Sequence, residues 1–247
     1  MASAPTAISD LPKGSVVAKT FSIGQKRVET RLFVRHDDGD WAGYSYEWND
    51  AETDATLLPG GKVKSVGGQD WTYPGRADCP RCHTTAAGRT LGLEIAQLGR
   101  TFDYPGRPAR DQLATLGHIG VFAADPPKIP ALPAPDGMGP AEARARAYLH
   151  SNCSFCHRPD GPTAAQMDLR FSTPFAQTKT CNVAPTRGDL GIAGAAIVKP
   201  GATSSSVLSK RAHATDFSRM PPLAIKKVDV AGTKTIDDWI GGLTGCP

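Results

Sequence analysis

The chain has 247 residues, enough for one or two compact domains, and its 40% hydrophobic content is sufficient for a packed core. No stretch reaches the roughly 18 apolar residues that a membrane-spanning helix requires, so we expect no transmembrane segment. The formal net charge of +4 is scattered, without a run of lysine and arginine, which makes nucleic acid an unexpected partner.

Residues 15–75 predict a small antiparallel β region. Apolar side chains recur at every second position in residues 28–35, which is the period of a half-buried strand. The turn-forming Asp37-Asp38-Gly39-Asp40 follows, so residues 42–48 should return as the second strand of a hairpin. A second hairpin is expected to turn at Gly67-Gly68.

The next segments predict helices and then a linker. Residues 91–98 and 110–122 carry apolar side chains at helical intervals, which predicts two short helices. Six prolines between positions 126 and 140 then favour a stiff, extended connection. We place a domain boundary there, with a β-rich region over 1–136 and a second domain over 137–247. In the second domain, residues 140–149 and 228–243 predict helices.

Each of these two regions carries one copy of the motif Cys-x-x-Cys-His, which is the attachment signature of haem c. Two thiols at this spacing can bond the two vinyl groups of one porphyrin, and the adjacent imidazole can then ligate the iron through Nε2. Structural zinc would not need a histidine in that position. The sequence therefore predicts two covalently bound haem c groups, held by Cys79, Cys82 and His83 and by Cys153, Cys156 and His157.

The second axial ligand of each iron is sought among the remaining histidines and methionines. For the second haem we expect Met220, in a loop stiffened by two prolines, with Met167 or His213 as alternatives. For the first haem His118 is the best candidate, because it lies between apolar residues of a predicted helix. Met138, His36 or an open position remain alternatives there. His36 and His150 are each expected to face solvent.

The remaining two cysteines bear on the cellular compartment. Cys181 and Cys246 could form a disulfide or remain two unrelated thiols, and we favour the disulfide. Haem attachment through thioethers normally takes place outside the cytoplasm, where a disulfide is also stable. Residues 1–5 have neither the basic nor the apolar part of a signal peptide, so we expect a periplasmic or otherwise extracytoplasmic chain whose signal peptide is absent.

The helix before the second motif and the closing helix resemble the layout of a class I cytochrome c domain, in which Tyr148 and Trp239 should meet at the helix crossing. The whole chain resembles an uncharacterised family of bacterial di-haem c-type cytochromes. The matching stretches are Trp71-Thr72-Tyr73-Pro74, Leu91-Gly92-Leu93-Glu94, Arg144-Ala145-Arg146-Ala147-Tyr148-Leu149, Asn152-Cys153 and Met220-Pro221-Pro222. This resemblance implies haem at both motifs and electron transport. Together with the predicted elements, we expect an α+β chain: a small antiparallel β region with a haem-binding helical segment, then a domain that resembles an all-α class I cytochrome c.

We therefore expect an electron-transfer protein rather than an enzyme. It would pass single electrons between redox partner proteins, an extracytoplasmic dehydrogenase and a terminal acceptor, with no bond-making at either iron. The alternative is a di-haem peroxidase-like enzyme, in which the first haem keeps an open axial position. A third interpretation makes both motifs ligands of structural zinc.

Overall fold

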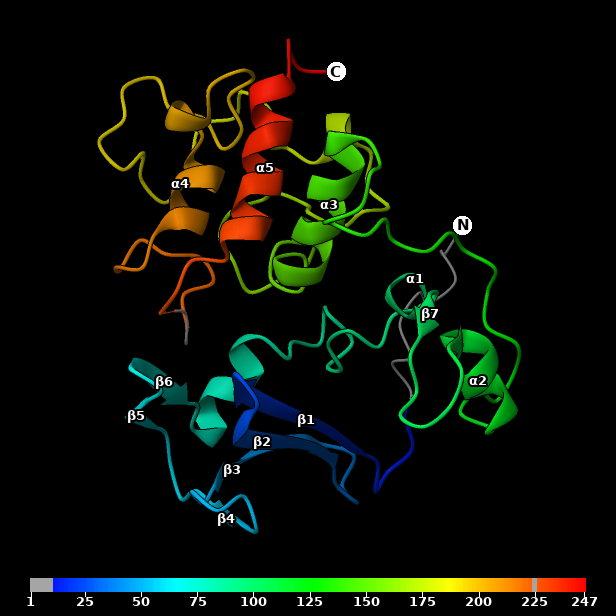
Figure 1. Ribbon diagram of the computed structural model, residues 1–247. Coiled ribbons are helices and arrows are strands. Elements are labelled where there is room, and N and C mark those ends of the chain that lie inside the picture. The colour runs from blue at the N-terminus through cyan, green and yellow to red at the C-terminus, as the bar shows by residue number, and fades with distance from the viewer. Residues whose placement is uncertain (1–10, 224–225) are drawn as a thin grey trace.

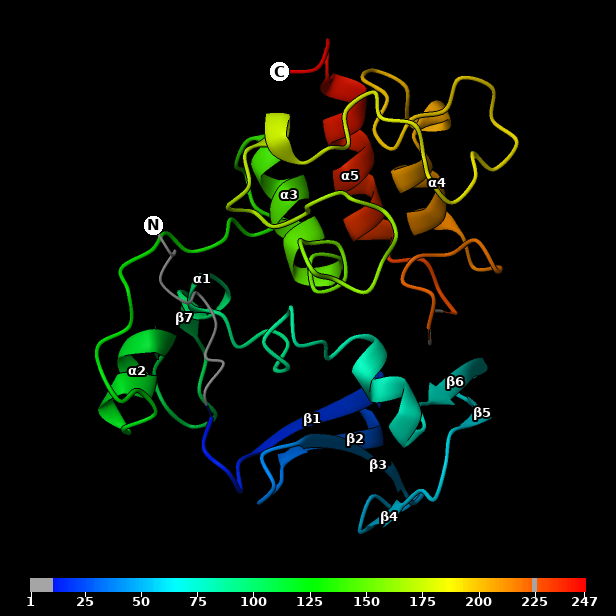
Figure 2. The same cartoon turned by 180° about the vertical axis from the view of Figure 1, so that it is seen from behind.

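The computed structural model describes residues 11–223 and 226–247. Residues 1–5, on which the signal-peptide prediction depends, lie outside the described residues. Strands form the lower half of the molecule in Figure 1, with α1 and α2 beside them, and α3, α4 and α5 form the upper half, an arrangement that the opposite view repeats (Figure 2). The main sheet is antiparallel, in the order β1 (Val16–Ile23), β2 (Lys26–Arg35), β3 (Trp41–Trp48) and β4 (Ala55–Leu57).

The two predicted hairpins are confirmed. Strands β2 and β3 pair across the predicted turn, with Phe33 opposite Gly43. The second hairpin, β5 (Lys62–Val66) and β6 (Gln69–Tyr73), turns at Gly67-Gly68, as predicted. These pairings follow from the alternation of side chains along each strand, because a shift by one residue would turn every side chain to the other face.

One face of the main sheet buries a carboxylate. The Glu29 side chain is fully buried, and Arg31 donates two hydrogen bonds of 2.8 Å to its carboxylate. Trp71 Nε1, from the second hairpin, donates a third at 3.0 Å. A buried carboxylate is tolerated when its lone pairs are all occupied in this way. The Glu29 carboxylate therefore connects the β5–β6 hairpin to the main sheet.

The segment after the first motif is less helical than predicted. Helix α1 covers only Ile95–Leu98, because the left-handed conformation of Gly92 (φ +80°) prevents the helix from starting at Leu91. Helix α2 covers Gln112–His118 and follows the two-residue strands β7 (Thr101–Phe102) and β8 (Arg110–Asp111). Residues 121–140 contain neither helix nor strand, as the prolines predicted.

The second half is built on two crossing helices, α3 (Ala141–Asn152) and α5 (Val230–Gly242), with α4 (Val207–His213) packed beside α5. Tyr148 lies directly over Gly232, where a β-carbon would be 2.1 Å from its ring. Its hydroxyl donates to Asp229 at 3.0 Å. Trp239 meets Phe175 edge to face, with ring centroids 5.0 Å apart. The crossing was thus predicted, and Tyr148 packs against the hydrophobic cluster that contains Trp239.

The expectation that this half is an all-α class I cytochrome c domain is wrong. Between α3 and α4 the chain forms only two short 3-10 turns, η2 (Phe175–Gln177) and η3 (Thr203–Ser205), and two isolated β-bridges, Cys181–Val198 and Ala196–Ser206. Residues 159–206 are rich in glycine and proline, which do not sustain a helix. The chain as a whole is a mixed α/β structure with an antiparallel sheet and short helices.

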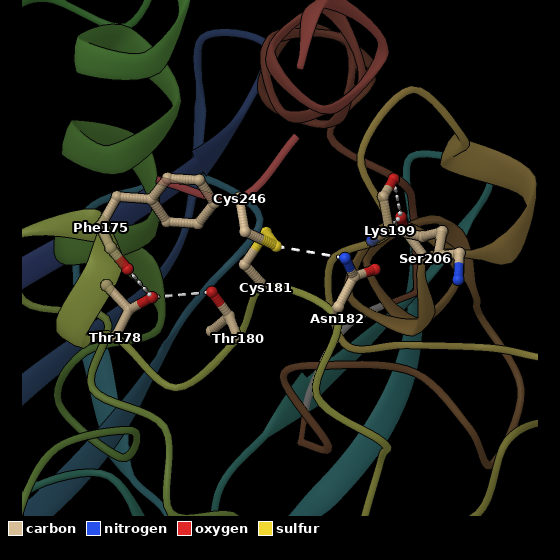
Figure 3. The surroundings of a disulfide bond; sticks show 8 residues. All are labelled: Phe175, Thr178, Thr180, Cys181, Asn182, Lys199, Ser206 and Cys246. Carbon is tan, nitrogen blue, oxygen red and sulfur yellow. Dashed lines mark hydrogen bonds between the residues drawn. A yellow bond between two sulfur atoms is a disulfide. The ribbon is translucent and has the colours of Figure 1, made fainter. Parts of the chain in front are cut away.

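The predicted disulfide between Cys181 and Cys246 is confirmed (Figure 3). Its Cα atoms are 5.8 Å apart, and Asn182 Nδ2 donates to Cys246 Sγ at 3.2 Å. The bond ties the segment after α5 to the irregular loop between α3 and α4. Throughout residues 11–223 and 226–247, no helix combines the length and the apolar character that crossing a bilayer requires.

Candidate functional site

The first motif forms a tight helical turn directly after strand β6. The 3-10 helix η1 covers Arg76–Arg81, and the amides of Cys82 and His83 both donate to Cys79 O, at 3.2 and 2.9 Å. Residues three and four apart lie on one side of a helical turn. The turn thus brings the two thiols and the imidazole of one motif to the same side.

Strand β3 leaves space for this turn by presenting small residues to it. A β-carbon on Gly43 would lie 2.3 Å from Cys79 Sγ and 3.0 Å from Cys79 Cβ. The neighbouring inward residue, Ser45, is buried and donates to Pro74 O at 3.0 Å. Gly43 is therefore the cradle of Cys79, and a larger residue would push the motif away from the sheet.

The His83 imidazole is held by its Nδ1 atom and by an aromatic neighbour. Nδ1 lies 2.7 Å from Arg89 O, so Nδ1–H donates to that carbonyl and the lone pair is on Nε2. The ring packs on Phe33 at a centroid distance of 4.2 Å, and Phe33 in turn stacks on Trp41 at 4.9 Å. Burial lowers the pKa of His83. This neutral, oriented imidazole is the form that ligates a metal.

The second motif repeats this arrangement at the end of α3. The amides of Cys156 and His157 donate to Cys153 O at 3.1 and 3.0 Å. Burial raises the pKa of the Cys153 thiol to about 12 and lowers the pKa of His157 to about 4. His157 Nδ1 lies 3.4 Å from the Thr163 hydroxyl. His157 is therefore a neutral imidazole at physiological pH, with a polar neighbour on the Nδ1 side.

The structure brings the two motifs into direct contact, which the sequence did not predict. The Cys156 thiol beside Cys82 lowers the pKa of Cys82 to about 7, and Cys82 in turn raises the pKa of Cys156. Cys156 Sγ also lies 3.5 Å from Arg81 O, and Thr84 Oγ1 donates to Phe155 O at 3.3 Å. The four motif cysteines are free, so all four thiols can react with another group.

A buried charged cluster lies beside this contact. Glu94 accepts a hydrogen bond of 2.5 Å from His150 Nε2, and its other oxygen lies 3.7 Å from Arg158 Nη2. The prediction that His150 faces solvent is wrong, because its side chain is only 9% exposed. Glu94 is itself 8% exposed. No local pattern could have revealed the pair, since its two members are 56 residues apart.

The candidates for the second haem differ in their surroundings. Met220 has a side chain at the surface, 36% exposed, and its amide donates to Arg211 O at 2.9 Å. Met167 packs against the hydrophobic core of the second half. His213 has its Nε2 atom 2.8 Å from the Asp237 carboxylate. Met220 is thus the candidate whose side chain is engaged neither in the core nor in an ion pair.

The candidates for the first haem lie away from the motif. His118 is exposed at the end of α2, and within the described ranges no contact joins it to the first motif. Met138 is fully exposed. His36 Nε2 lies 2.9 Å from the Tyr44 hydroxyl, so His36 is paired and partly buried instead of solvent-facing. None of the three is brought to His83 by the contacts described.

The residues of both motifs fit haem c better than they fit zinc. A structural zinc ion needs four protein ligands, and the part of the chain that the structure describes has no group of three or more His, Cys, Asp or Glu side chains suited to a metal ion. Haem iron needs only one or two side chains, because the porphyrin supplies the other ligands. Each motif offers two free thiols and a neutral imidazole, and Gly43 makes room for the first motif, which together meet that smaller requirement.

Comparisons of the chain with protein-family models, with curated proteins and with solved structures found no match. The resemblance to a family of bacterial di-haem c-type cytochromes with a C-terminal class I cytochrome c domain is therefore wrong. No family model supports it, and the second half consists largely of irregular loops between short helices. The chemistry of the two motifs therefore rests on their own residues.

Proposed function

We propose that this chain carries two covalently bound haem c groups and transfers single electrons between redox proteins outside the cytoplasm. The observation that carries the proposal is the pair of Cys-x-x-Cys-His turns, each with free thiols. In the first of them the imidazole is held through Nδ1, with its Nε2 lone pair available. Two such turns in contact with each other suit a protein that moves electrons from one iron to the next.

Each motif residue has a defined role in holding haem. Cys79 and Cys82 would hold one porphyrin through thioether bonds, each formed by adding S–H across a vinyl group, and Cys153 and Cys156 would hold the second. His83 and His157 would each bind iron through Nε2. Haem bound in this way supplies a one-electron couple of its iron.

Met220 is proposed as the second axial ligand of the haem at Cys153 and Cys156. A thioether favours reduced iron, so this haem should have the higher reduction potential of the two. The two prolines after Met220 limit the conformations of its loop, which favours a fixed position of the sulfur.

The compartment and the partners follow from the chemistry of attachment. Disulfides persist in oxidising compartments, so the bond between Cys181 and Cys246 supports a periplasmic or otherwise extracytoplasmic location. We propose that an extracytoplasmic dehydrogenase donates electrons and that a terminal acceptor receives them. Nucleic acid is not proposed as a partner, because the net charge of +4 is scattered along the chain.

A second candidate function is peroxidase-like chemistry at the first haem. It is favoured by the exposed positions of His118 and Met138, because neither side chain is then held near His83 to bind the iron of a haem there. Peroxide or cyanide should then change the optical spectrum of the first haem alone. A low-spin spectrum that neither ligand alters would exclude this alternative.

The test is to count covalent haems on the mature protein made in a host that performs c-type maturation. We expect two haems by intact mass and by the pyridine haemochrome spectrum, and one haem after Cys79→Ser with Cys82→Ser. The control, Cys181→Ser, removes a cysteine outside the motifs and should leave both haems attached. Correctly matured protein without any covalent tetrapyrrole would overturn the proposal.

A further inference from the structure

We propose that Glu94, His150 and Arg158 form a buried clasp that holds the two attachment motifs against each other and thereby sets the electrostatic coupling between the two irons. The inference rests on the proposed function, because the coupling exists only when both haems are attached. These three are positioning residues, since none of them is a haem ligand.

The Glu94 carboxylate joins the residues on both sides of the second motif to the segment that follows the first motif. Glu94 lies at the start of α1, on the chain that leaves the first motif. His150 lies just before the second motif and Arg158 just after it, and Glu94 contacts both. All three side chains are about 90% buried, at 10%, 9% and 11% exposed. Gln97 Nε2 donates a further hydrogen bond of 3.2 Å to Glu94.

The hydrogen bonds of His150 define its tautomer. The Phe171 amide donates to Nδ1 at 3.1 Å, so Nδ1 is an acceptor and Nε2 carries the hydrogen that is donated to Glu94. Although burial raises the pKa of Glu94, its hydrogen bonds outweigh that effect and hold the pKa below its ordinary value. Glu94 is therefore an anion whose charge is balanced by the guanidinium of Arg158.

Arg158 connects the two halves through backbone and side-chain acceptors. Its Nε donates to Ser154 O at 2.5 Å and its Nη2 donates to Ser154 Oγ at 3.1 Å, both within the second motif. Its Nη1 donates to Ala86 O at 3.2 Å, three residues after His83. A buried ionic network with every partner in place has one geometry, because any displacement leaves a charge unpaired.

The clasp determines how strongly the irons influence each other. Oxidation adds a positive charge at one iron, and this charge opposes oxidation of the other with an energy that falls as their separation grows. The two motifs also touch where Thr84 Oγ1 donates to Phe155 O at 3.3 Å and where Cys156 Sγ lies 3.5 Å from Arg81 O. Loosening the clasp lets these two attachment points separate. The coupling between the haems should then weaken, whereas each haem stays attached.

The test compares Glu94→Gln with the control Glu142→Gln in the mature, full-length protein. Glu142 is a carboxylate on α3 that pairs with Arg146 at 3.3 Å within one helix. The readouts are the bisignate circular dichroism of the Soret band and the interaction potential, which is the shift of each midpoint potential caused by the other haem. The reference for each shift is a variant that lacks one motif's cysteines.

We expect Glu94→Gln to retain both haems but to lose most of the Soret couplet and of the interaction potential, while Glu142→Gln matches the wild type. If Glu94→Gln does not fold, Arg158→Lys gives the same test, because it retains the charge but loses the forked hydrogen bonds. An unchanged couplet and an unchanged interaction potential in whichever variant folds would overturn the proposal.

Failure of the proposed function would be recognised separately, by wild-type protein that carries no haem. In that case hydrogen exchange of the Phe171 amide, which depends on His150, still tests the clasp. Faster exchange at Phe171 in Glu94→Gln than in Glu142→Gln would support the clasp, and equal rates would refute it.

Discussion

Replacing Gly43 by alanine tests whether strand β3 is the support of the first attachment motif. The added β-carbon would lie 2.3 Å from Cys79 Sγ and 3.0 Å from Cys79 Cβ. Carbon and sulfur atoms in contact are normally about 3.5–4.0 Å apart, so the motif has to move by more than about 1 Å. These two Cys79 atoms cannot move aside on their own, because Cys79 has a short side chain and lies on a hydrogen-bonded turn.

Overpacking of this kind costs about 1–3 kcal/mol, and we expect the free energy of unfolding to fall by that amount in Gly43→Ala. Because the displaced part is the first motif, haem attachment at Cys79 and Cys82 should fall, while attachment at Cys153 and Cys156 stays complete. Intact mass spectrometry separates chains with one haem from chains with two, and urea unfolding gives the change in stability.

Gly60→Ala is the matched control, since nothing lies within 4 Å of the β-carbon that it would add. It should keep both haems and the wild-type stability. The reasoning would be refuted if Gly43→Ala carried two haems and unfolded at the same urea concentration as Gly60→Ala. That result would mean that the first motif does not depend on its contact with β3.

Two further predictions concern stability. Cys181→Ser opens a disulfide that spans 65 positions, so loop entropy predicts a loss of about 4 kcal/mol, seen as a lower midpoint of guanidinium unfolding; an unchanged midpoint would contradict it. Although burial raises the pKa of Glu47, hydrogen bonds from Lys62 and Lys64 outweigh it and hold the pKa below the ordinary 4.5. The stabilisation by the Glu47 carboxylate is therefore present above pH 4.5 and lost as the pH falls further. Glu47→Gln should be less stable than the wild type at pH 7 and nearly equal to it once the carboxyl is protonated. Unfolding followed by tryptophan fluorescence measures the difference. A stability difference that does not depend on pH would argue against this role.

The elements with a clear local period were predictable. Alternating side chains and the Asp37–Asp40 turn predicted the β2–β3 hairpin, a run of strong helix formers after Pro140 predicted α3, and helical spacing of apolar residues predicted α5. These signals arise within a few residues, so they need no knowledge of the rest of the chain. Helix α4 was not predicted, because it covers only Val207–His213 and is stabilised by packing against α5 more than by its own sequence.

The candidate site was predicted by residue type but not by arrangement. Spacing alone identified the motif residues, since Cys-x-x-Cys-His is a contiguous signal. The contact between the motifs and the burial of Glu94 depend on segments more than 50 positions apart, as the 56-residue separation of Glu94 and His150 shows. His150 was expected at the surface because a histidine on a helix gives no local sign that a carboxylate from another segment will cover it.

The prediction of an all-α second domain was wrong for a related reason. The helix before Cys153 and the closing helix were both predicted correctly, and their crossing suggested a familiar architecture. The residues between them decide the fold, and their glycines and prolines favour turns over helices. Two correct helices therefore do not specify a domain when the segment between them has no helical period.

Polar groups join the two halves beside the motifs, and contacts of this kind constrain the motifs more than an apolar contact would. Apolar surfaces can slide against each other at small cost, because burial depends on area and has no direction. Hydrogen bonds and buried charges do have direction, and displacing Arg158 would remove the guanidinium from the Glu94 carboxylate and the hydrogen bond to Ala86 O. Contacts of this type suit a protein whose function depends on a fixed separation between two attachment points. The proline-rich segment at 121–140 contacts both halves as well, since Leu132 N donates to Ala96 O at 2.8 Å and Thr235 Oγ1 donates to Pro135 O at 3.4 Å. The contacts of Arg158 differ in that they lie directly beside the two motifs.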